Sequence, residues 1–549
     1  MKFSIKQSYP SHHFNKHWQF CVGGDHAAQV LRVDYLRQLN YVHEELGMRY
    51  VRFHGIFNDD MHTISTMNDI MPLKGGERFK ELTFHKCGLA YDNVLAVGMK
   101  PFVELGFMPK ALASNPETGV LFYGSNFSMP KDLNEWADYI KAFIRYLLHR
   151  YGEEEIVSWY FEVWNEPDLQ GAFFKGTKQD YYKLYEITVR AIKEVCPRLR
   201  VGGPSTSGSR WIKSFVNYCR ANNIPLDFVT THQYAGDPLS GVEDKGGPDD
   251  DQTDNKISSD NNSENSETEE IKAFKEMMNR DIYGSMPDGS CLDVIRNLIQ
   301  DKSEKEELPD NLFRNNSRIV QEQADGLPVY YTEWNFNAIF SAYSNDTRKV
   351  AAYDVKAALD IANYVTGTSI WCFSDIFEEM HQFPQEFHGG FGIQTQSGIP
   401  KPVFYALKML AKTGDERINL GEDATDGEIG IAAFRSSSEV QILLFRQKMK
   451  NTELAKEKAE VSVESSSKPK RIIMERIDEE HCNPLKVWED MGQPDALNSS
   501  EAAEIIRKSA MIEEELDYSY DKKAVSFCVE LGVNDVYFIR IINGGNEDD

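Results

Sequence analysis

The stretch Trp159-Tyr160-Phe161-Glu162-Val163-Trp164-Asn165-Glu166-Pro167 is an aromatic and β-branched run that ends in a carboxylate between an asparagine and a proline. The same construction recurs downstream as Pro328-Val329-Tyr330-Tyr331-Thr332-Glu333-Trp334-Asn335. Each run predicts a strand that delivers one glutamate to the edge of a sheet. Two carboxylates at two strand ends indicate paired acid chemistry.

Further β-rich runs alternate with segments of helical spacing such as 132–151, 179–195 and 348–364. The strand candidates are 18–23, 49–55, 101–107, 159–164, 199–203, 228–233, 328–333 and 368–373. Alternating strands and helices indicate a parallel sheet. An open doubly wound sheet would normally show a glycine-rich phosphate turn after an early strand, and the sequence has none. We therefore predict a closed (β/α)8 TIM barrel over residues 15–412, with its active site at the C-terminal strand ends.

The flanking segments differ in character from the barrel. After about residue 415 the chain alternates apolar and polar residues, which is typical of antiparallel strands. We predict a β-rich, sandwich-like accessory domain built from 1–14 and 413–549, in which Lys2–Tyr9 joins the sheet, 448–471 is a charged loop and 495–510 is helical. Within the barrel we predict an acidic insertion at 237–325. Its segment 237–270 has 12 acidic residues against two lysines and is expected to be disordered or a mobile loop.

Composition excludes several classes of function. The net charge of −26 would repel nucleic acids and anionic membranes, so we predict neither as a partner. The eight cysteines show no CxxC pair, which indicates reduced thiols and no zinc site. The polar N-terminus lacks the apolar core of a secretory signal, and no stretch approaches the ~20 apolar residues of a membrane span. A cytoplasmic protein is the resulting expectation.

The paired glutamates fit glycoside hydrolysis, in which one carboxyl protonates the leaving oxygen and the other attacks or activates water. Glu162 and Glu166 are separated by roughly 13 Å along a strand, too far for that pair, so Glu162 and Glu104 are expected to support the barrel interior. We expect Glu166 to be the proton donor, because a second carboxylate raises its pKa, and Glu333 to be the ionised nucleophile. Asn165 could donate to a sugar 2-hydroxyl.

Other strand-end residues could contact a sugar. His54 and His232 could hydrogen-bond hydroxyls or orient a carboxylate, although each alone is more often structural. The aromatic candidates for a sugar platform, for which ordinary core packing is the alternative, are Trp371, Phe373, Phe173 and Phe174. A metal cluster of His54, Asp59, Asp60 and His62 lacks a known ligand spacing and carries little weight.

At these residues the chain resembles family 39 of the glycoside hydrolases, and bacterial β-xylosidases in particular. The resemblance rests on the order of segments 17–23, 51–55, 107–113, 161–167, 332–334, 373–379, 387–392 and 487–492. It implies Glu166 as acid/base and Glu333 as nucleophile. The subsite that it implies for the terminal sugar is lined by His54, Asn165, His232, Tyr234, Trp371 and Glu379, to which we add Phe173 and Glu378 as candidate substrate-binding residues.

The resemblance further implies a retaining exo-β-1,4-xylosidase that acts on short xylo-oligosaccharides as a homotetramer, without cofactor or metal. One departure is Ala338, where the xylosidases usually carry a tyrosine. Tyr234 stands where the α-L-iduronidase branch is expected to carry a lysine, so a neutral pentoside is favoured. The alternatives are another retaining exo-glycosidase, such as a β-glucosidase, α-L-arabinosidase or α-L-iduronidase-like enzyme, or a catalytically silent carbohydrate-binding protein.

Overall fold

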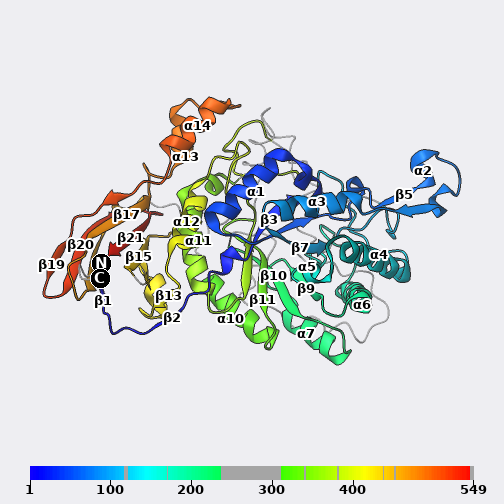
Figure 1. Cartoon of the computed structure of the whole chain (residues 1–549), viewed down its shortest axis with the longest axis horizontal. Helices are drawn as coiled ribbons and strands as arrows, with labels where there is room; N and C mark the ends of the chain where they lie inside the picture. The colour runs from blue at the N-terminus through cyan, green and yellow to red at the C-terminus, as the bar shows by residue number, and fades with distance from the viewer. Residues whose placement is uncertain are drawn as a thin grey trace, which may run out of the picture.

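The computed structural model describes residues 1–116, 121–169, 171–235, 311–338, 340, 342–379, 383–436, 438–450 and 453–543. Its centre is a closed barrel of parallel strands, and the N- and C-terminal segments meet in β-sheets at one side of it (Figure 1).

The barrel strands are β3 (Cys21–His26), β4 (Tyr50–His54), β7 (Lys100–Leu105), β8 (Tyr160–Val163), β9 (Arg200–Thr206), β10 (Phe228–Tyr234), β11 (Val329–Asn335) and β12 (Gly367–Ile370). They close in sequence order, with β12 paired to β3. The surrounding helices are α1 (Val33–Leu46), α3 (His85–Ala96), α4 (Leu133–Tyr151), α5 (Glu153–Ile156), α6 (Lys178–Val195), α7 (Ile212–Ala221), α10 (Leu312–Ala324), α11 (Arg348–Ile361) and α12 (Pro402–Lys412). The predicted TIM barrel is confirmed.

Aromatic rings close the N-terminal end of the barrel. Phe20, Phe102, Tyr160, Phe228 and Tyr330 are buried in one cluster, and their rings pack at centroid distances of 4.8–6.4 Å. Packed rings of this size leave no path through the barrel floor. A ligand therefore has to enter from the C-terminal strand ends.

The first barrel strand begins later than predicted. His17–Gln19 forms the 3-10 turn η1, and β3 starts only at Cys21 and continues to His26. The side chain of His17 explains the turn, because its ring nitrogens bond Thr368 Oγ1 and the carbonyl of Ala358, both at 2.9 Å. The extension of β3 brings Asp25 and His26 to the same strand-end rim as His54.

Two sheets form the β-rich accessory region. The seven-stranded sheet has the order β18 (Glu514–Glu515), β17 (Arg471–Ile477), β21 (Val536–Ile542), β15 (Glu439–Phe445), β14 (Gly430–Arg435), β13 (Glu416–Ile418), β2 (Ser11–His13). The four-stranded sheet has the order β1 (Lys2–Ile5), β16 (Glu457–Glu464), β20 (Ala524–Leu531), β19 (Ser519–Asp521). Apolar side chains of both sheets form one core. The first strand, β1, and the last strand, β21, both lie in this region (Figure 1).

Details of this region both confirm and correct the predictions. Lys2–Ile5 pairs with β16, so the N-terminal strand does join an accessory sheet. The prediction of a charged loop over 448–471 was wrong, because β16 lies inside it. The charges of β16 alternate with buried Ala459, Val461 and Val463, so they cover only its outer face. The predicted helix at 495–510 is α14 (Ser499–Lys508), which contacts α13 (Pro484–Asp490).

Two other segments lie outside the accessory sheets. An arm of β5 (Ile64–Thr66), α2 (Met67–Ile70) and β6 (Lys80–Leu82) projects from the barrel side (Figure 1). In the range predicted as an insertion, 312–324 forms α10, which contacts α7 and α11, whereas 237–270 lies outside the described residues. No helix in the described ranges is long and apolar enough to cross a membrane.

Candidate active site

Glu166 and Glu333 meet at the C-terminal rim of the barrel. Both are buried, with 8% and 5% of their surfaces exposed. One oxygen of Glu166, one oxygen of Glu333 and a ring nitrogen of His232 all lie within 4.8 Å of one another. Carboxyl groups about 5–5.5 Å apart are typical of retaining glycosidases, whereas inverting enzymes need about 6.5–9.5 Å to admit a water. The nearest oxygens of Glu166 and Glu333 thus place two carboxyl groups at one site, as paired acid chemistry requires.

The backbone turns sharply to present Glu166. Trp164 and Glu166 have φ values of 74° and 44°, in the left-handed region that non-glycine residues rarely adopt. The amide N–H of Glu166 donates to the carbonyl of Ser205 at 2.8 Å. Asp168 accepts from the N–H and the hydroxyl of Ser207, both at 2.9 Å. These bonds tie the loop after β8 to the end of β9 and hold the strained turn in place.

Arg52, on β4, organises the carboxylates inside the barrel. It is fully buried and donates to Glu162 at 2.6 Å, to Glu333 at 2.9 Å and to the side-chain oxygen of Asn165 at 2.7 Å. Glu104 lies 3.1 Å from the same guanidinium. Since the oxygen of Asn165 is engaged, its amide hydrogens are the groups that remain to face a ligand. Glu104 and Glu162 are thus the buried supports that the sequence predicted.

His54 connects this network to Glu379. One ring nitrogen bonds Glu104, and the other lies 3.2 Å from Glu379 and 3.5 Å from Glu333. Burial acts against the charged imidazolium, but Glu104 and Glu379 together raise the pKa of His54 well above its usual value. Glu104 keeps a pKa below its usual value, since His54 and Arg52 outweigh its burial. His54 is therefore a second cation at the site.

His232 and Tyr234, both on β10, contact the two central glutamates. His232 Nδ1 lies 2.8 Å from Glu166 Oε1, and the Tyr234 hydroxyl donates to Glu333 Oε2 at 2.7 Å. Burial lowers the pKa of His232 to about 4, which leaves the imidazole neutral near pH 7. Burial also raises the pKa of Glu333, an effect that His232 and Arg52 oppose. The raised pKa thus belongs to Glu333, the carboxyl that was expected to be ionised, and the assignment of the two roles depends on other grounds.

An aromatic wall borders these groups. Trp371 lies directly after β12, and its ring is 4.6 Å from that of His54. Tyr234 and Trp371 belong to a buried cluster with Phe340, Phe377 and Phe391, and Ala338 packs against it. The position where a tyrosine hydroxyl was missing is thus part of an apolar wall, while the hydroxyl that reaches Glu333 comes from Tyr234.

Two further predicted residues, Phe173 and Glu378, lie at the margin. Phe173 packs its ring 5.5 Å from that of Phe127. Glu378 turns toward the surface, where its side chain is 34% exposed and lies 3.4 Å from Arg32. Asp375, on the loop after β12, forms a buried ion pair with Lys401 at 2.6 Å and accepts from the Gly392 N–H at 2.7 Å, so it anchors this loop.

The three-residue group of Glu166, His232 and Glu333 is the one set in the described chain that could chelate a metal ion. These are the same groups whose separation suits acid and nucleophile, and Glu166 and Glu333 each already have a hydrogen-bond partner. The donor set is therefore explained by the paired carboxyl chemistry.

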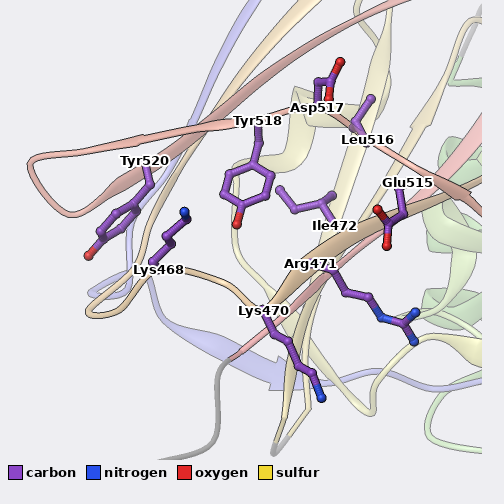
Figure 2. A pocket seen from close by; sticks show the side chains of 9 residues that line it. All are labelled: Lys468, Lys470, Arg471, Ile472, Glu515, Leu516, Asp517, Tyr518 and Tyr520. Carbon is purple, nitrogen blue, oxygen red and sulfur yellow. The ribbon is translucent and has the colours of Figure 1, made fainter.

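A separate cavity of about 380 Å³ lies in the accessory region, between the loop before β17 and the strands β18 and β19 (Figure 2). Its polar lining includes Lys468, Lys470 and Arg471, along with the rings of Tyr518 and Tyr520. Both tyrosine hydroxyls already donate to backbone carbonyls of the same loop, those of Pro469 and Ser465. The cavity contains neither Glu166 nor Glu333, so the chemistry belongs to the barrel rim.

Sequence reasoning missed Arg52 and Asp25 as parts of the site. An arginine inside the apolar strand Tyr50–His54 is a signal, because a charged side chain is buried only where it is paired. Asp25 gave no such signal. Its partners, the backbone N–H groups of Glu378 and Glu379, lie 353 and 354 residues away in the chain.

The chain is similar to known β-xylosidases over most or all of its length. A curated β-xylosidase of Caldicellulosiruptor saccharolyticus is 33% identical over 546 residues, which cover 99% of each chain. One from Geobacillus stearothermophilus is 32% identical over 88% of this chain and 84% of its own. The solved structure of a monomeric β-xylosidase from Caulobacter crescentus CB15 is 28% identical, covers 99% of this chain and 100% of its own, and gives a TM-score of 0.76.

The chain also matches a sequence model of a whole protein family. The model of the family described as glycosyl hydrolases family 39 matches residues 1–280 and 289–520. Because that match spans most of the chain, this protein belongs to glycosyl hydrolase family 39 and is a glycoside hydrolase.

Proposed function

We propose that the protein is a retaining exo-β-1,4-xylosidase that releases xylose from short xylo-oligosaccharides. The observation that carries this proposal is the approach of a Glu166 oxygen and a Glu333 oxygen to within 4.8 Å. That spacing favours a covalent glycosyl-enzyme over direct attack by water. The substrate class is supported by the two relatives named β-xylosidases, one of which matches along its full length.

In the first step Glu333 attacks the anomeric carbon of the terminal xylose. The hydrogen bonds from Arg52 and Tyr234 fix its two oxygens, Oε1 and Oε2. As the bond from the carboxylate to the anomeric carbon forms, the glycosidic bond breaks and Glu166 gives its proton to the departing oxygen. His232, which is bonded to Glu166 through Nδ1, orients that carboxyl group.

In the second step water replaces the aglycone. Glu166, now ionised, removes a proton from this water as its oxygen attacks the anomeric carbon, and the ester bond to Glu333 breaks. Two inversions return the β-configuration. The amide of Asn165, which Arg52 holds by its oxygen, is placed to donate to the sugar 2-hydroxyl in both transition states. The reaction needs protein side chains and water alone.

The remaining candidate residues define the sugar subsite. Trp371 offers a ring face, and His54 and Glu379 offer polar groups for the ring hydroxyls. A neutral pentose suits this set, because the two cations of the site, Arg52 and His54, already face carboxylates of the protein. A substrate carboxylate of the iduronide type would add another negative charge among Glu104, Glu162 and Glu333.

The first test is hydrolysis of 4-nitrophenyl β-xyloside, β-glucoside, α-L-arabinoside and α-L-iduronide, with NMR of the first-formed anomer. The proposal predicts that the β-xyloside is the best substrate and that β-xylose forms first. An α-anomer first would contradict the retaining mechanism, and a different best substrate would move the specificity to another exo-glycosidase. Turnover of none would favour a carbohydrate-binding protein.

The homotetramer and the cytoplasmic location are further parts of this proposal. The relative from Caulobacter crescentus CB15 is described as monomeric, so the quaternary state has to be measured on this chain. Light scattering after gel filtration is expected to give four times the chain mass of 62.8 kDa. A single-chain mass would overturn the tetramer.

A further inference from the structure

Glu379 stands on the loop after β12, and its backbone is held from two sides. On one side its carbonyl accepts from the N–H of Phe122 at 2.9 Å. On the other side its own N–H donates to Asp25 Oδ1 at 3.2 Å, and the N–H of Glu378 donates to Asp25 Oδ2 at 2.8 Å. One carboxylate at the end of β3 therefore holds two successive peptide groups of the Glu379 loop.

The side chain of Glu379 connects this loop to the reaction centre through His54. The Glu379 carboxylate lies 3.2 Å from His54 Nε2, and the same nitrogen lies 3.5 Å from Glu333. Asp25 itself is 1% exposed and contacts the loop through backbone groups rather than through Glu379's side chain. It therefore acts on the position of Glu379 while standing behind the site.

The carboxyl group of Asp25, which anchors this loop, has an unusually high pKa. Burial, and then the charge of Glu379, raise the pKa of Asp25 to about 7. Asp478 in the accessory region makes the same kind of anchor, since it accepts from the N–H groups of Glu480 and His481 at 2.9 Å each. There the hydrogen bonds and the charge of His481 outweigh burial and keep the pKa below its usual value. A buried carboxylate that faces a second carboxylate is costly for folding alone.

We propose that Asp25 is a positioning residue that fixes Glu379 in the subsite for the terminal sugar and thereby contributes to sugar specificity. The inference rests on the proposed function, because it takes Glu379 as a sugar contact. It predicts that the effect of Asp25 on catalysis passes through Glu379. A residue that merely stabilised the barrel would act independently of Glu379.

The test is a double-mutant cycle with Asp25→Asn and Glu379→Gln, measured with aryl β-xylosides. Each single substitution is expected to lower kcat/KM about 10-fold or more, mainly through KM, because a charged hydrogen bond to the sugar is lost or misplaced. The double variant is expected to fall no more than about 2-fold below Glu379→Gln alone. Multiplicative losses would overturn the proposal.

Asp478→Ala is the control, since both backbone N–H groups bond Asp478 Oδ1 and the substitution removes that acceptor from an anchor outside the barrel. It is expected to leave kcat/KM within about 2-fold of the unchanged protein. An equal loss in this variant would show a general folding effect and would also overturn the proposal. If Asp25→Asn does not fold, Asp25→Ser, which keeps an acceptor, takes its place in the cycle.

A failure of the proposed function gives a different result. If the unchanged protein prefers another aryl glycoside, the proposed β-xylosidase specificity is wrong. The double-mutant cycle is then measured with the preferred glycoside. If it hydrolyses none, the same cycle is run on the Kd of xylose by calorimetry. In each case non-additivity between Asp25 and Glu379 supports the positioning role, and additivity contradicts it.

Discussion

Two clusters of charged side chains show how differently this protein uses ion pairs. The active-site cluster consists of Arg52, His54, Glu104, Glu162, Glu333 and Glu379. The interface cluster joins barrel helices α10 and α11 to the accessory turn η9 (Glu422–Thr425) and the residue after it, and consists of Arg314, Lys356, Asp360 and Asp426.

The clusters differ in charge balance. In the interface cluster two cations face two carboxylates, and each carboxylate contacts both cations at 2.6–2.8 Å. In the active-site cluster two cations serve four carboxylates, with Glu166 close by. The unbalanced negative charge disfavours a second anion and favours the positive charge that develops on the sugar ring. The interface cluster therefore has equal numbers of cations and carboxylates, whereas the active-site cluster has an excess of carboxylates.

The largest expected effect is that of Glu166→Gln, which removes a proton donor without changing the side-chain shape. Hydrolysis of xylobiose is expected to fall about 10²–10⁴-fold. A 2,4-dinitrophenyl xyloside should lose far less in the glycosylation step, since its leaving group needs little protonation. Steady-state kinetics on both substrates check this, and azide should speed turnover of the activated xyloside. Equal losses in glycosylation would contradict the role of Glu166.

Arg52→Met sharpens the comparison by removing the shared cation of the catalytic cluster. Glu162 and Glu333 would lose their buried partner, so the free energy of unfolding is expected to fall by about 3–5 kcal/mol. Activity should fall as well, because Glu333 loses one of its two positioning donors. Urea unfolding together with kcat/KM measures both. A variant that keeps full activity would show that the cation balance is irrelevant to catalysis.

Lys356→Met makes the corresponding change in the interface cluster. Asp360 and Asp426 would keep Arg314, and Asp426 is partly exposed, so a smaller loss of about 1–3 kcal/mol is expected. Because this cluster stands apart from the rim, kcat/KM of the folded protein should stay within about 2-fold. A large loss of activity at unchanged stability would break the distinction between the two clusters.

The smallest effect concerns Asp354 on α11, a buried carboxyl whose oxygens have no hydrogen-bond partner among the described residues. Burial raises its pKa well above the usual value. A folded-state pKa above that of the unfolded chain favours folding only at low pH, and this contribution is lost as the pH rises. Asp354→Asn should therefore stabilise the protein by about 1–3 kcal/mol at pH 7 and by less near pH 4. Urea titrations at both pH values test it, and a pH-independent difference would contradict the raised pKa.

The barrel was predictable because its strands carry continuous apolar runs, and because Glu166 and Glu333 interrupt such runs at their ends. The strand β16 was not, since the charges on its outer face hid the buried alternation of Ala459, Val461 and Val463. Glu379 could be found through resemblance, but its support by Asp25 depends on two strand ends that are adjacent only after the barrel closes. Local patterns predicted the elements and the acids, and closure of the barrel determined their partners.

The central claim is that Glu333 forms a covalent bond with the sugar. Treatment with 2,4-dinitrophenyl 2-deoxy-2-fluoro-β-xyloside should trap this species. The fluorine slows both its formation and its hydrolysis, whereas the activated leaving group speeds its formation alone, so the glycosyl-enzyme accumulates. Mass spectrometry of proteolytic fragments is predicted to find one sugar on the peptide that contains Glu333. A label on Glu166 or another carboxylate, or turnover through an inverted product without any label, would contradict the account.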